Sequence, residues 1–143
     1  MSEVKVDGRR AAVRPWHVFA FGSVLAVGAL VERVQGFRAG RQYVLCHASA
    51  TLDHLTLLAL GLVAGALLVG IVGAAAETVR GKASRPAFLV ACMVAALAFV
   101  VAADRVDAGA EERAVRMAGE SFTEGACDYA PQVYSATPGW FSW

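Results

Sequence analysis

Two long apolar stretches separate the first cysteine of the chain from the last, and they limit its possible folds more than any other feature. Leu55–Ala76 has 22 residues without a charge, and Pro86–Ala103 has 18. A membrane helix needs about 20 predominantly apolar residues, so both stretches are predicted to cross a bilayer. Two crossings return the chain to the side that it left. Cys46 and Cys127 are therefore expected on the same face of a membrane.

The composition agrees with this class of protein. Hydrophobic residues make up 57% of the 143 residues, against about 45–50% in soluble domains. Charged residues make up only 17%, where about 25% is usual. The excess lies in segments dominated by Ala, Val, Leu and Gly, which indicates a membrane protein. A net charge of +1 argues against a nucleic-acid partner.

A third apolar run lies near the amino terminus. Trp16–Val31 has 16 uncharged residues and can lengthen at both ends, because Arg14 and Arg33 can extend to the headgroups. Trp16 suits the membrane interface. We therefore predict an all-α integral membrane protein with three transmembrane helices and an irregular extracytoplasmic carboxy-terminal tail. The expected segments are an arm at 1–15, transmembrane helices at 16–34, 54–77 and 86–104, an outer loop at 35–53, a cytoplasmic turn at 78–85, and a helix extension with the tail at 105–143.

The last part of the chain suggests a docking segment. Beyond Gly119, glycines and prolines are expected to prevent regular structure, and too few aliphatic residues remain for a separate core. Aromatic side chains are the groups that could anchor this tail, either on a partner protein, which we favour, or in the headgroup layer. The predicted anchors are Tyr134, Trp140, Phe141 and Trp143.

The cysteines help to orient the chain. The amino-terminal arm and the turn at 78–85 carry seven basic residues, and the opposite face carries six, which only slightly favours a cytoplasmic amino terminus. A disulfide between Cys46 and Cys127 would persist only in an oxidising compartment. We predict this bond, although two free thiols are the alternative, and therefore place the carboxy terminus outside the cytoplasm. Cys92 is expected to be a packing residue.

Small residues recur in the second span at spacings suited to close helix contact. Gly61 and Gly65 form a GxxxG pair, and Gly70 continues the pattern. Such residues let two helix backbones approach each other in lipid. We predict that Gly61, Gly65 and Gly70 pack against a helix of this chain or of another.

The sequence offers little for catalysis, and we expect neither an enzyme nor a cofactor. The cysteines lack the spacing of a metal or cluster site. His17, His47 and His54 lie near the ends of the expected spans, and no acid, base or amide lies deep inside one. Transporters and proton pathways usually bury such groups.

These observations favour a non-catalytic accessory or structural subunit of a larger membrane protein complex. Its partners would be other membrane protein subunits and lipid, as for small subunits of respiratory and photosynthetic assemblies, an analogy only. The first alternative is a component of an oligomeric transporter or channel. The second is a small membrane redox protein, which would need a reactive thiol pair.

Overall fold

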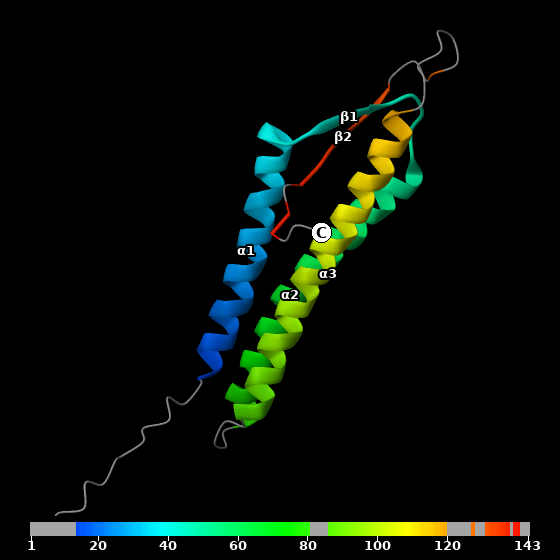
Figure 1. Ribbon diagram of the computed structural model, residues 1–143. Helices are drawn as coiled ribbons and strands as arrows, with labels where there is room; N and C mark the ends of the chain where they lie inside the picture. Colours follow the sequence, from blue (N-terminus) through cyan, green and yellow to red (C-terminus); the bar gives the residue numbers. More distant parts are fainter. Residues whose placement is uncertain (1–13, 81–85, 120–126, 128–130, 138, 141–143) are drawn as a thin grey trace, which may run out of the picture.

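The computed structural model describes residues 14–80, 86–119, 127, 131–137 and 139–140. Three helices run up, down and up through a bundle (Figure 1). They are α1 (Pro15–Ala39), α2 (Ala50–Arg80) and α3 (Pro86–Ala118), and two strands accompany them, β1 (Gln42–Leu45) and β2 (Gln132–Ser135). The carboxy-terminal end of α1, the start of α2, the end of α3 and both strands lie at the same end of the bundle.

Each helix is apolar and long enough to cross a membrane, as the sequence predicted. Mean hydropathy reaches 1.5 in α1, 2.6 in α2 and 2.5 in α3. The 31 residues of α2 and the 33 of α3 correspond to about 47 and 50 Å. A hydrocarbon core is about 30 Å thick. Both helices therefore extend past the membrane, and the fold is that of a multi-pass membrane protein.

Local signals explain where α1 begins and ends. Pro15 occupies the first turn, where its missing N–H leaves no hydrogen bond unmade. The backbone N–H of Arg14 donates to Nδ1 of His17 at 3.0 Å. At the other end, the N–H of Gly40 donates to the carbonyl of Gly36 at 2.8 Å. The segment 35–53, expected as a loop, thus contains the last turn of α1, β1 and the start of α2.

Glycine and alanine let the helices approach closely. A Cβ on Gly22 would lie 3.2 Å from both the carbonyl oxygen of Ala66 and the Cα of Gly70. A Cβ on Gly65 would lie 3.4 Å from the ring of Phe99. Gly65 and Gly70 therefore face α3 and α1, respectively. Gly61 would meet nothing within 4 Å, so the predicted pair does not act as one contact inside this chain. The buried core of the bundle is made of Ala26, Ala29, Ala59, Val63, Ala66, Ala96, Val100 and Ala103.

The two strands form an antiparallel ribbon, so the expectation of a tail without regular structure is wrong. Tyr43 pairs with Tyr134, and Val44 pairs with Val133. Alternation along the ladder turns the tyrosines toward the helices and the two valines outward. Leu45 is fully buried in a second small core with Leu52, Ala110 and Ala114. The tail obtains order because a strand from the first loop supplies its hydrogen-bond partners.

Candidate functional site

Three acidic residues lie on one face of the carboxy-terminal half of α3. Asp104, Asp107 and Glu111 are spaced three and four residues apart, which places them on the same side of a helix. Each of them binds a different part of the chain. The extension of α3, expected from the sequence only as a helix extension, is therefore the centre of the polar structure at this end.

The deepest of these contacts is an ion pair between α1 and α3. A guanidinium nitrogen of Arg33 binds Oδ2 of Asp107, and only 9% and 11% of these two side chains are exposed. Arg33 was expected to extend to the headgroups, but both Arg33 and Asp104 are buried. A cavity of about 10 Å³ lies beside the pair. That is about the space of one water molecule, so this cluster cannot admit a larger ligand.

Glu111 binds the side chain of a residue in β1. Its Oε1 accepts a hydrogen bond from the hydroxyl of Tyr43 at 2.9 Å. Arg41 forms an ion pair with the same carboxylate at 2.9 Å, although 70% of the Arg41 side chain is exposed. The hydrogen bond to Glu111 is the main cause that raises the pKa of Tyr43. Burial, and then the carboxylates of Asp107 and Glu111, raise the pKa of Tyr134 to about 12. Both tyrosines therefore remain neutral at physiological pH.

Trp140 contacts both α3 and α1. Its backbone N–H donates to Oδ1 of Asp104 at 2.9 Å. Its ring lies on Gly28 of α1, where a Cβ would come within 3.0 Å of the indole. Tyr134 and Trp140 thus contact this chain itself, although both were predicted as anchors for a partner. Phe141 and Trp143 lie outside the described residues.

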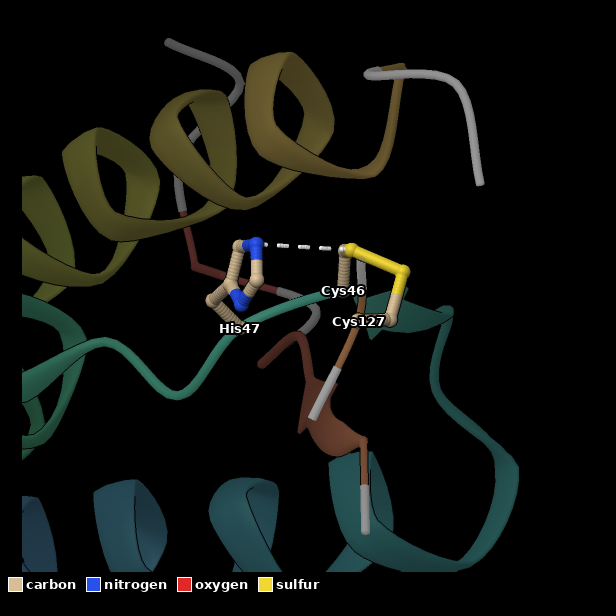
Figure 2. The surroundings of a disulfide bond; sticks show 3 residues. All are labelled: Cys46, His47 and Cys127. Carbon is tan, nitrogen blue, oxygen red and sulfur yellow. Dashed lines mark hydrogen bonds between the residues drawn. A yellow bond between two sulfur atoms is a disulfide. The ribbon is translucent and has the colours of Figure 1, made fainter. Parts of the chain in front are cut away.

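A disulfide joins Cys46 to Cys127, as the same-face argument predicted (Figure 2). The two Cα atoms are 4.7 Å apart. Nε2 of His47 lies 3.6 Å from the sulfur of Cys46. The bond therefore attaches the tail directly to the end of β1.

A side-chain bridge adds a second attachment next to the disulfide. The side-chain oxygen of Gln132 accepts a hydrogen bond from the backbone N–H of Ser49 at 2.6 Å. Its Nε2 donates to Oδ1 of Asp53 at 2.9 Å. One residue of β2 thus satisfies a backbone donor at the start of α2 and an acid in its first turn. Sequence reasoning missed this role because an isolated glutamine carries no pattern.

The polar groups around the three acids of α3 bind one another. Within the described ranges, Oγ of Ser23 is the only buried side-chain polar atom without a hydrogen-bond partner. In the same part of the chain, no three His, Cys, Asp or Glu side chains gather in a way that could hold a metal ion. Asp104, Asp107 and Glu111 therefore attach Trp140, α1 and the region of β1, respectively, to α3.

Comparison with known proteins gives no relative: no family model, no curated protein and no solved structure matches this chain.

Proposed function

We propose that this chain is a non-catalytic accessory or structural subunit of a larger membrane protein complex. The observation that carries the proposal is the apolar surface that the bundle leaves outward. In each of the three spans, only 22% of the most apolar window is buried within the chain. On α2, Leu57 is 65% exposed and Val72 is 61% exposed. Lipid or neighbouring helices must cover this surface.

The internal use of the charged groups supports a structural role. Arg33, Asp107 and Glu111 each bind another segment of the chain, and the cavity beside the buried ion pair is too small for a substrate. A transport pathway or catalytic centre needs groups that can change partners during the reaction.

The outward face of the ribbon is the surface that we propose for extramembrane docking. Val44 and Val133 lie opposite each other on it and are 44% and 54% exposed. An exposed apolar pair next to the polar pair of Gln42 and Ser135 suits contact with another protein. The tail thus remains a docking element in this proposal, and the contact with the partner protein is made by β2 together with β1.

Site-specific photo-crosslinking in native membranes tests the helix contacts. A crosslinking residue at Leu57 or Val72 should capture a distinct membrane protein, whereas the same residue at the buried Ala59 should not. Crosslinks to lipid alone would contradict the proposal. Crosslinks to a second copy alone would favour the oligomeric transporter or channel.

Co-purification in mild detergent tests the ribbon. Val44→Glu combined with Val133→Glu should reduce recovery of the partner without lowering the melting temperature, because both side chains are exposed. Gln42→Glu, at another exposed position of β1, is the matched control. Full recovery of the partner with the double variant would remove the ribbon from the interface.

A further inference from the structure

A second polar feature lies between the start of α2 and the end of α3. A surface cavity of about 530 Å³ opens there, lined by Ser49, Thr51, Leu52, Arg113, Arg116 and Met117. Small-molecule sites commonly measure about 300–1,000 Å³. This cavity is therefore large enough for an organic ligand, unlike the one beside Arg33.

The charge of the cavity is positive. Arg113 and Arg116 are three residues apart, so they lie on the same face of α3. No carboxylate of a described residue lines the cavity. Among the described residues, no acid forms an ion pair with either guanidinium. Asp53, the acid in the first turn of α2, accepts a hydrogen bond from Gln132 instead. Two arginines without an ion-pair partner among the described residues are well suited to an oxyanion, since each guanidinium can donate two parallel hydrogen bonds.

The remaining lining fits a ligand that is more than a simple anion. Ser49 and Thr51 add two hydroxyl groups, and Ser49 is only 9% exposed. Its position is fixed because its N–H binds Gln132. Leu52 and Met117 add apolar surface. A few placed polar groups beside apolar surface are typical of sites for organic molecules. The amino-terminal end of α2 adds positive potential, although the arginines define the site.

The depth of the cavity points to the membrane surface. Thr51 and Leu52 lie about one helical turn before Leu55, where the uncharged stretch of α2 begins. One turn is about 5 Å, and the headgroup layer on each side of the hydrocarbon is about 5–7 Å thick. Basic pockets between membrane helices bind the headgroups of anionic lipids.

We propose that this cavity is a binding site for the phosphate group of an organic phosphate, with Arg113 and Arg116 as its main ligands. The phosphate can belong to an anionic phospholipid or to a soluble phosphate ester. Both present the same oxygens to the guanidinium groups, and the two sources differ in whether acyl chains must lie along the helices.

Thermal unfolding of the full chain in a neutral detergent tests the site. Phosphatidylglycerol, phosphatidylcholine and glycerol 3-phosphate are added in separate titrations. A ligand that binds only the folded protein raises the melting temperature in a concentration-dependent way. A rise with phosphatidylglycerol alone assigns the site to lipid, and a rise with glycerol 3-phosphate assigns it to soluble esters. No rise with phosphatidylglycerol or glycerol 3-phosphate, or an equal rise with the zwitterionic phosphatidylcholine, would overturn the proposal.

Variants show whether the arginines cause the effect. Arg113→Gln with Arg116→Gln should weaken the apparent affinity roughly 10- to 100-fold, as for the loss of hydrogen bonds to charged groups. Arg38→Gln, an exposed cation at the end of α1 and outside the cavity, should leave it unchanged. Equal affinity of the double variant and the wild type would refute the site. If the double variant does not fold, the affinity of Arg113→Lys with Arg116→Lys is measured in its place. It must bind more weakly than the wild type, because lysine loses the two-pronged contact.

Discussion

At the scale of single residues, the buried ion pair is where a substitution should cost most. Arg33→Met leaves the carboxylate of Asp107 without its partner in a setting that is only 11% exposed. Breaking one side of such a pair typically costs about 3–5 kcal/mol. We expect a loss of that size in the free energy of unfolding, measured by denaturant titration in detergent micelles.

Two further variants separate this effect from a general loss of charge. Arg33→Met combined with Asp107→Leu should recover most of the stability, because neither member of this pair then remains buried without the other. Arg41→Met removes the largely exposed partner of Glu111 and should cost only about 0–1 kcal/mol. If the double variant loses as much as Arg33→Met alone, the two charges do not depend on each other.

The raised pKa of Tyr134 predicts a loss of stability at high pH. The pKa of an unfolded tyrosine is 10, and the folded structure raises it to about 12. The unfolded chain therefore gives up this proton first. The contribution is complete below pH 10 and is lost as pH rises through 12. The measurement is the phenolate absorbance of the wild type minus that of Tyr134→Phe, together with unfolding at pH 9 and 11.5. A difference spectrum with its midpoint near pH 10 would contradict the buried setting of this hydroxyl.

At the scale of helices, the crossing of α1 and α2 should tolerate no added side chain. Gly22→Leu would place atoms where the backbone of Ala66 and Gly70 already lies. Overpacking of this kind costs about 1–3 kcal/mol, so we expect a lower melting temperature in detergent. Gly61→Leu enters open space and should change the free energy of unfolding by no more than about 0.5 kcal/mol. The reverse order of these two effects would mean that the helices pack through a different face.

The helices also show what could be predicted from the sequence and what could not. Long apolar stretches determine that three helices form, and the parity of the crossings places Cys46 and Cys127 together. The contact face of α1 was harder to predict. Gly22 has no second glycine four positions away, and its small neighbour at that spacing is Ala26, in a helix that contains several alanines. The GxxxG pair instead joins Gly61, which faces outward, to Gly65, which meets Phe99.

The ribbon was not predictable for a related reason. Each strand has only four residues, too few for an alternation pattern to stand out from chance. A two-stranded ribbon is also barely stable alone and needs packing against other elements. The burial of the acids of α3 could not be predicted either, because Asp107 becomes buried only when α1 and the tail cover it.

At the scale of the whole molecule, the position of the disulfide predicts a labelling pattern. In intact cells, a membrane-impermeant maleimide applied after reduction should modify both Cys46 and Cys127, because we expect both outside the cytoplasm. Cys92 lies inside the span of α3 and should remain unmodified. Mass spectrometry counts the added groups. Modification of both cysteines only after cell lysis would reverse the predicted orientation.

Because β1 is synthesised well before β2, the ribbon can close only late in synthesis. Gln132, where β2 begins, follows the last residue of β1 by 87 positions. A ribosome adding about 5–20 residues per second needs roughly 4–17 s for that length. Throughout this interval the chain crosses the membrane twice more, and the amides of β1 have no strand to pair with. A product that stops early keeps that open edge, so the closed ribbon distinguishes a finished and fully inserted chain from an incomplete one.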